Sequence, residues 1–269
     1  MVFEVRDLWP QGAVELKKIR NPLFIKAAFI FEKVCYTNSD IVVVASQGMY
    51  ESINNRYASI QTLIIPNASD IVLFSSSHNE IVKSTGNEGL KYFVYTGSIG
   101  LIDDLEQCID AMSIVRRNDI RLIIIGDGAE RKYLEEKVKI QNINNVEFLG
   151  LKPKSELVQW YSKAWASILT VTDTPVIQAC SPNKMFDSFA AGVPIIQNST
   201  GWIKTLVETE NCGINIEQHN PKNFADAISF ICDHPDKRNY YAQNALRLAQ
   251  TEFNRDNLAE KYINAIEAL

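Results

Sequence analysis

Residues 181–187 combine side-chain types that could bind a phosphorylated nucleoside. They run Ser-Pro-Asn-Lys-Met-Phe-Asp and lead into small and apolar residues typical of a helix. Near a helix N-terminus, Lys184 opposes the helix dipole at a cost of about 0.3–1 kcal/mol if exposed, and a bound phosphate would turn that cost into a gain. As a carboxylate, Asp187 could accept hydrogen bonds from two vicinal hydroxyls. A capping role in the first helical turn is the alternative for Asp187.

A glycine-rich turn at residues 96–100 could supply backbone amides to the same ligand. Its sequence is Thr-Gly-Ser-Ile-Gly, between an expected strand and a helix whose first turn holds two aspartates. Glycines let N–H groups approach an anion, and a helix N-terminus favours phosphate. Gly97, Ser98 and Gly100 are therefore candidate phosphate contacts, although ordinary turn chemistry explains such glycines equally well.

Two further loops follow expected strands and could flank a base. The first, Gly-Asp-Gly, falls short of the G-x-G-x-x-G pattern because Arg131 stands at its last position, which disfavours a nicotinamide site. Capping of the next helix is its alternative role. In the second loop a proline could fix the backbone beside a base, or simply stiffen the entry to a helix. The candidates are Gly126, Asp127, Gly128, Leu151, Lys152 and Pro153.

The loops need a scaffold, which the spacing of apolar residues predicts. Beyond residue 90, short apolar strands alternate with helices, as in a parallel sheet covered on both faces. In such sheets ligands bind at the carboxyl ends of the strands, where all four loops fall. The expected strands are residues 92–95, 121–125, 146–149, 166–170, 194–197 and 213–216.

The first 67 residues predict a smaller unit with strands at 2–5, 41–45 and 62–65. Residues 68–90 are rich in Ser, Asn and Gly with weak periodicity, which predicts a linker. The predicted fold class is therefore α/β with two parallel-sheet units. We expect an N-terminal domain over residues 1–75, a C-terminal domain over 76–250, and a C-terminal helix over 251–269 that returns toward the first domain.

Composition narrows the classes of function. Apolar residues make up 46% and charged residues 22% of the 269 residues, an ordinary globular balance. The net charge of −5 lacks the basic field that nucleic-acid binding needs. Five cysteines without a C-x-x-C pair indicate neither a disulfide framework nor a zinc site. No signal peptide and no membrane span are apparent, so we expect a cytoplasmic protein without a metal.

Taken in order, the motifs resemble the family 4 retaining glycosyltransferases of the GT-B fold, especially bacterial enzymes of surface-polysaccharide synthesis. The resemblance covers nearly the whole chain. The motifs that carry it are Phe-Glu-Val-Arg-Asp-Leu-Trp-Pro at 3–10, Ile-Pro-Asn at 65–67, Tyr-Thr-Gly-Ser-Ile-Gly at 95–100, Ile-Gly-Asp-Gly at 125–128, Val-Glu-Phe-Leu-Gly at 146–150, and residues 181–194.

The resemblance implies a nucleoside-diphosphate sugar as donor, with a UDP-sugar expected rather than a GDP-sugar, and a lipid-linked or saccharide acceptor. It implies no cofactor and no metal, because basic side chains and backbone amides stabilise the leaving diphosphate. Asp187 falls on the family's ribose-binding carboxylate. The implied diphosphate ligands are Lys184, Gly97, Ser98, Gly100, Ser181 and Asn183, with the loops at 126–128 and 151–153 beside the base.

The chain also departs from the family pattern. Ala179 stands where the family has a sugar-contacting glutamate, a role that Gln178 or Asn183 would have to take over. Ser98 and Asp103 stand where many members carry Arg and Lys. The resemblance further implies an incomplete N-terminal domain without its acceptor loop, so the catalytic residues are unknown. Another polypeptide supplying the missing half, or a non-catalytic remnant that binds a nucleotide or a partner, are the alternatives.

The segment from Leu16 to Lys33 mixes basic and aromatic residues. Such a helix could rest on anionic lipid, at the inner face of a membrane, where a lipid-linked acceptor is presented. An apolar stripe facing the core, with solvated lysines along its edge, is the alternative. A nucleotide-sugar 2-epimerase is a further alternative, but it would need a set of acidic and histidine residues that the sequence does not offer.

Overall fold

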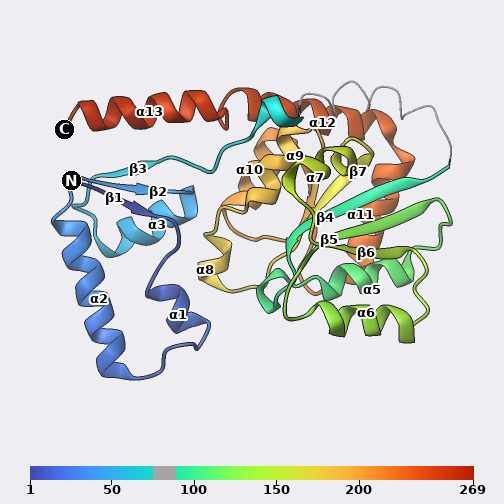
Figure 1. Ribbon diagram of the computed structural model, residues 1–269, viewed down its shortest axis with the longest axis horizontal. Helices are drawn as coiled ribbons and strands as arrows, with labels where there is room; N and C mark the ends of the chain where they lie inside the picture. The colour runs from blue at the N-terminus through green and yellow to red at the C-terminus, as the bar shows by residue number, and fades with distance from the viewer. Residues whose placement is uncertain (75–88) are drawn as a thin grey trace.

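The computed structural model describes residues 1–74 and 89–269, which form two parallel sheets in separate bodies (Figure 1). We call residues 1–67 the N-terminal body and residues 89–250 the C-terminal body. The first sheet has the order β1-β2-β3, with bounds Val2–Val5, Ile41–Val44 and Thr62–Ile64. The second has the order β6-β5-β4-β7-β8-β9, with β4 (Lys91–Ser98), β5 (Ile120–Asp127), β6 (Val146–Gly150), β7 (Ala164–Leu169), β8 (Ile195–Gln197) and β9 (Gly213–Asn215).

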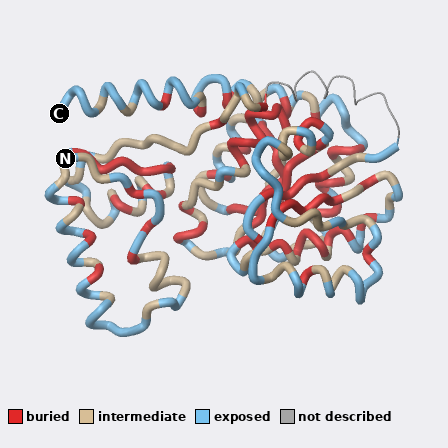
Figure 2. Tube along the Cα trace, viewed as in Figure 1, coloured by how far each residue is buried: buried red, intermediate tan, exposed pale blue. Residues whose placement is uncertain are grey.

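Alternating side chains on the central strands give the second sheet its two buried faces. Phe93 and Tyr95 of β4 face one core, which α5 (Glu106–Ile114), α6 (Arg131–Ile140) and α11 (Pro221–Asp233) cover. Val94 faces the opposite core, beneath α7 (Lys154–Tyr161) and α9 (Asn183–Ala190). Beside these helices, α10 (Trp202–Glu210) and α12 (Pro235–Gln250) complete that layer. Figure 2 shows the buried backbone running through this sheet.

The N-terminal body surrounds β2, whose four residues are all buried. Asn21 and Ser46 accept amide hydrogen bonds as N-caps of α2 (Pro22–Thr37) and α3 (Gln47–Arg56), which explains where both helices begin. α1 (Gln11–Glu15) packs against α8 (Pro175–Gln178) of the other body. Because β1 pairs only with β2 among the described strands, its other edge is open.

A shared core and several hydrogen bonds join the bodies. Val176, Ile177 and Ala179 pack into the core of the N-terminal body. The Val176 amide donates to Glu15 Oε2 at 2.8 Å, and Asn67 Nδ2 donates to the Ser181 carbonyl at 2.7 Å. The segment around α8 is therefore held from both sides.

The predicted linker at 68–90 is partly wrong. Its described beginning is packed rather than loose: Ser69 and Phe74 are buried. The Ser69 amide donates to Phe253 O at 3.0 Å, and its hydroxyl to Phe186 O at 2.7 Å. Polar composition hid these contacts because their partners lie far along the chain. The predicted domain boundary after residue 75, and the linker from 75 to 88, lie outside the described residues.

The final helix, α13 (Arg255–Glu267), leaves the C-terminal body and runs alongside the N-terminal body in Figure 1. There Lys261 Nζ donates to the Ile64 carbonyl at 3.0 Å. The five cysteines are all free. In the described parts of the chain, no helix has the length and apolarity to cross a membrane.

Candidate functional site

A cavity of about 380 Å³ lies at the carboxyl ends of β4 and β7, against the N-terminus of α9. Backbone, hydroxyl and charged groups from three loops share it with apolar side chains. Its polar lining includes Gly97, Ser98, Asp103, Thr170, Asn183, Lys184 and Asp187. The structure thus brings together five of the residues that the sequence assigned to phosphate and ribose, namely Gly97, Ser98, Asn183, Lys184 and Asp187.

Lys184 is nearly buried, with its side chain 12% exposed, and it is paired, so the cost considered for an exposed lysine near the helix N-terminus does not apply. Its Nζ donates to the Tyr95 hydroxyl at 2.7 Å and to Asp103 Oδ1 at 3.2 Å. The ammonium also lies 4.0 Å from the centroid of the Tyr95 ring, within cation–π range. Burial lowers the pKa of Lys184, and the Asp103 carboxylate opposes that effect.

Asp103 is the anionic member of this group. It lies in the short turn η1 (Leu101–Asp103), and its Oδ2 accepts from Ser98 Oγ at 2.8 Å and from the Gly100 amide at 3.1 Å. The Tyr95 hydroxyl donates to the Ser98 carbonyl, and burial together with nearby Asp103 raises the pKa of Tyr95 well above its ordinary value. One buried carboxylate therefore organises the loop after β4.

Asp187 lies in the second turn of α9, with its side chain 11% exposed and 2.9 Å from Lys154 Nζ. The helix has no side-chain cap, which excludes the capping role considered for Asp187. Burial raises the pKa of Asp187, and Lys154 partly offsets this effect. A buried carboxylate with one exposed partner keeps oxygen lone pairs for a ligand.

Other predicted residues do not line this cavity. The Gly100 amide is bonded to Asp103, and Ser181 has its carbonyl bonded to Asn67 while its buried hydroxyl has no partner. A Cβ at Gly126 would lie 1.7 Å from the Gly97 carbonyl oxygen, so close packing of two loops accounts for this glycine. Asp127, Gly128, Leu151, Lys152 and Pro153 also lie outside the cavity lining, and Leu151 is exposed.

Three residues of the site were not expected from the sequence. Tyr95 was part of an expected strand, where a tyrosine is typical of a core. Thr170 lies just after β7, and its buried Oγ1 lines the cavity without a partner. Lys154 opens α7 and reaches Asp187 across 33 residues of sequence. The only signal in the sequence was that Tyr95 and Thr170 are the last residues of the strands expected at 92–95 and 166–170.

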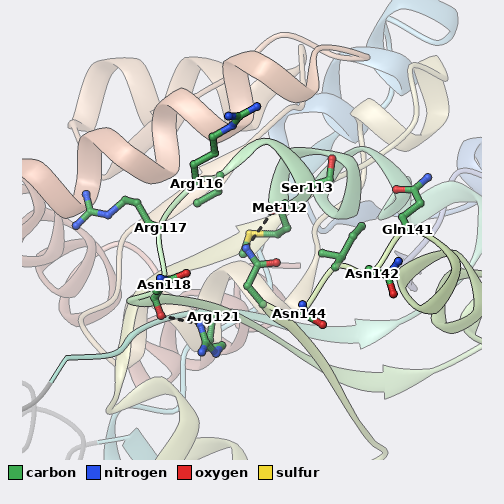
Figure 3. Close-up of a pocket in the computed structure, with 12 residues that line it drawn as sticks. Met112, Ser113, Arg116, Arg117, Asn118, Arg121, Gln141, Asn142 and Asn144 are labelled. Atoms are coloured by element: carbon green, nitrogen blue, oxygen red, sulfur yellow. Dashed lines mark hydrogen bonds between the residues drawn. The ribbon is translucent and has the colours of Figure 1, made fainter.

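A second cavity of about 380 Å³ lies at the opposite edge of the same sheet, between the ends of α5 and α6 and the starts of β5 and β6. It holds three arginines and several side-chain amides. Figure 3 shows Arg116, Arg117 and Arg121 extending away from one another. Arg117 is paired with Asp119 and Asp233, and Arg121 donates to backbone carbonyls. These cations do not converge on one ligand.

The sequence model of one family, described as Glycosyl transferases group 1, matches residues 76–248. The chain belongs to this family. An uncharacterized glycosyltransferase of Methanocaldococcus jannaschii is 25% identical over 176 residues, 65% of this chain and 44% of that protein. The D-inositol 3-phosphate glycosyltransferase of Corynebacterium glutamicum is 20% identical over 244 residues, 84% of this chain and 57% of that protein. The chain spans about half the length of these curated relatives.

Solved structures of glycosyltransferases share the fold. Sucrose-phosphate synthase from Thermosynechococcus elongatus matches with a TM-score of 0.79 at 20% identity, covering 99% of this chain and 67% of that one. Anabaena HepE in complex with UDP-glucose matches with a TM-score of 0.79 at 18% identity, covering 100% of this chain and 72% of that one. Together with the parallel sheets, these likenesses confirm the predicted α/β fold of GT-B type.

Proposed function

We propose that the cavity beside α9 binds a nucleoside-diphosphate sugar, and that the protein transfers the glycosyl unit with retention to a lipid-linked or saccharide acceptor. The observation that carries this proposal is the presence of two nearly buried charges in one cavity, the cation Lys184 and the carboxylate Asp187. Buried charges are costly, and they cluster where a ligand is bound. The Lys184 ammonium would pair with an anionic diphosphate, and the Asp187 carboxylate would accept hydrogen bonds from the hydroxyls of a ribose.

The proposed roles follow from the chemistry of each group. Lys184 and the backbone amides near Gly97 would hold the diphosphate and stabilise it as the leaving group, without a metal. Asp187 would accept from the ribose hydroxyls. Ser98, Gly100, Ser181 and Asn183 remain candidate phosphate contacts, and residues 126–128 and 151–153 candidate base contacts. No catalytic acid or base is assigned.

A UDP-sugar with a hexosyl or N-acetylhexosaminyl unit is the proposed donor, and a bacterial surface polysaccharide the proposed product. HepE, which shares the fold, has been solved with UDP and with UDP-glucose. WcaI of Escherichia coli, described as a putative colanic acid biosynthesis glycosyl transferase, is 26% identical over 171 residues, 61% of this chain and 42% of that protein. These similarities support the donor and the product class.

Calorimetric titration with UDP and GDP tests the donor site. We expect UDP to bind at micromolar strength, and Lys184→Ala and Asp187→Ala each to weaken binding at least tenfold. Lys204→Ala is the matched control, because Lys204 is exposed and its ion pair within the described residues is with Glu208, across one helical turn. A folded wild-type chain that binds neither nucleotide would sink the assignment.

A second proposal concerns α2, whose outer face carries exposed Leu23, Phe24, Ile30 and Phe31 at helical spacing. Exposed lysines flank these residues, including Lys26 within the helix. We propose that this face lies on an anionic membrane surface at the cytoplasmic side. Sedimentation with phosphatidylglycerol vesicles should capture the wild type but not Phe24→Ser/Phe31→Ser, and phosphatidylcholine vesicles should capture neither. Equal capture by both vesicle types would contradict the electrostatic part.

A non-catalytic chain that binds a nucleotide or a partner subunit is the alternative function. Ala179 favours this alternative, because it stands where the family has a sugar-contacting glutamate. The residue is buried and packs closely against Gly48, where an added Cβ would lie 2.8 Å from the Ala179 Cα. A partner polypeptide that supplies further strands would pair with the open edge of β1. Transfer of a radiolabelled sugar by the purified chain would exclude this alternative.

A further inference from the structure

Asp103 occupies the groups that the donor diphosphate would need. Ser98 Oγ, the Gly100 amide and Lys184 Nζ are three of the candidate phosphate ligands, and all three donate to this one carboxylate, at 2.8, 3.1 and 3.2 Å. Both charged side chains are nearly buried, with Lys184 12% and Asp103 10% exposed. The set is therefore already satisfied by an anion from the chain itself.

The charge balance makes this arrangement consequential. Lys184 contributes one positive charge and Asp103 one negative charge, and no other charged side chain is bonded to either of them in the described chain. A diphosphate arriving beside Asp103 would place like charges within a few ångströms of each other in a poorly solvated cavity, which is unfavourable. Tyr95 and Asp103 already take two of the three ammonium hydrogens of Lys184, so a diphosphate would share the remaining one or replace Asp103.

The turn that carries Asp103 is built so that it could move. η1 has three residues, Leu101 and Ile102 are exposed, and Asp104 after it adopts a left-handed backbone with φ of 45°. One hydrogen bond, from the Thr172 amide to the Ile102 carbonyl at 3.0 Å, ties the turn to the loop after β7. Ile99 and Leu105 anchor the two flanks of the turn in the core, and the bonds of the Asp103 side chain hold the turn between them.

We propose that Asp103 competes with the donor's diphosphate for Lys184, Ser98 and Gly100. It thereby sets how much affinity the second phosphate adds. This inference rests on the proposed nucleotide site. In that site, UDP must displace Asp103 from Lys184, Ser98 and Gly100. The second phosphate then adds little net affinity. Binding by the wild type depends mainly on the nucleoside, and the diphosphate is gripped strongly only when the carboxylate is removed.

Titration with UMP and UDP tests the proposal on the wild type, on Asp103→Asn and on Asp226→Asn. The last is the matched control, since Asp226 is exposed and paired with Lys222 across one turn of a helix. In the wild type and the control, we expect UDP to bind within about threefold of UMP. In Asp103→Asn, UDP affinity should rise about tenfold or more while UMP affinity changes less than about threefold.

Two outcomes overturn the proposal. A wild type that binds UDP more than tenfold tighter than UMP shows that Asp103 does not compete, and this measurement needs no variant. Weaker UDP binding by a folded Asp103→Asn shows instead that the carboxylate positions Lys184 for phosphate. Absence of binding to either nucleotide, in the wild type and in the variants alike, overturns the proposed nucleotide site itself, and is thereby distinct from the first two.

Discussion

The two edges of the six-stranded sheet carry cavities of equal volume, about 380 Å³ each, but of opposite character. At the carboxyl edge, Lys184, Asp103 and Asp187 are nearly buried and paired inside the cavity. At the amino edge, Arg116 is exposed, and the arginines extend apart (Figure 3). Volume does not separate these cavities. The difference lies in buried charge, which costs free energy and is retained where it serves a ligand.

The largest expected effect is on the backbone packing that shapes the carboxyl edge. Gly126→Ala would force a Cβ to within 1.7 Å of the Gly97 carbonyl oxygen. We expect the free energy of unfolding to fall by about 3 kcal/mol or more. Asn144→Ala at the amino edge is the matched control, with a change below about 0.5 kcal/mol. Urea denaturation measures both, and similar losses for the two variants would erase the comparison.

At the amino edge, Arg117 should matter for stability rather than for binding. Its guanidinium, followed by Lys91, holds the pKa of Asp119 well below its usual range. The resulting stabilisation is fully present above the ordinary pKa near 3.8 and is lost as the pH falls through the lowered folded-state pKa. Arg117→Ala should cost about 1–2 kcal/mol at pH 7, a modest value because both side chains are partly exposed.

Unfolding titrations of Arg117→Ala between pH 2 and pH 7 check this prediction. The gap between wild type and variant should narrow below pH 4. A gap that stays constant over the whole range would assign the effect to lost packing of the arginine stem instead of the ion pairs. UDP affinity serves as the control, and it should not change.

At the carboxyl edge, Asp187→Asn should stabilise the fold while it damages the proposed ligand site. Burial raises the pKa of Asp187, so the folded chain binds more protons and ionisation costs stability above that raised pKa. We expect a gain of about 0.5–1 kcal/mol at pH 7. The gain should disappear as the pH falls through the raised pKa toward 3.8. Destabilisation at pH 7 would mean that the Lys154 ion pair outweighs the burial.

The smallest effect is expected for Arg116 and Arg121, the other two arginines of the amino-edge cavity. Arg116→Ala/Arg121→Ala removes two cations from the amino-edge cavity, and UDP affinity should stay within about twofold, because these groups do not converge on an anion. Calorimetry at low salt, where surface charges act over longer distances, gives the most sensitive measurement. A tenfold loss of UDP affinity would move the nucleotide site to this edge.

The sequence predicted the strands and the clustering of Lys184, Asp187 and Ser98, because parallel strands bring their following loops to one edge. It could not predict that Asp103 bonds to three of the expected phosphate ligands. That contact is made within the short turn η1, which begins after Gly100 and brings the Asp103 carboxylate back onto the Gly100 amide and the Ser98 hydroxyl. Gly126 shows the opposite case. The Gly-Asp-Gly sequence that it opens resembled a ligand-binding loop, but close packing against Gly97 accounts for this glycine.

The linker prediction failed for a related reason. Ser69 and Phe74 sit in a polar stretch, and their burial depends on Phe186, Phe253 and Tyr161, which no local pattern connects with them. Local composition reports solvent exposure only when no distant segment covers the chain. Contacts between residues far apart in sequence determine both the geometry of the site and the packing of residues 69–74. Sequence periodicity does not encode such contacts.

The described chain crosses between the two bodies twice, at residues 65–74 and again between α12 and α13, and the crossings touch. Ser69 donates to Phe253 and forms a bridge with Asn254. Two bodies joined at two adjacent points can rotate about the line through those points. A rotation about any other axis would break the bridge between Ser69 and Asn254. In Figure 1 the contact of α1 with α8 lies away from the crossings. A rotation of one body against the other that kept both connections intact would therefore have to separate α1 from α8 and open the core that Val176, Ile177 and Ala179 share with the N-terminal body.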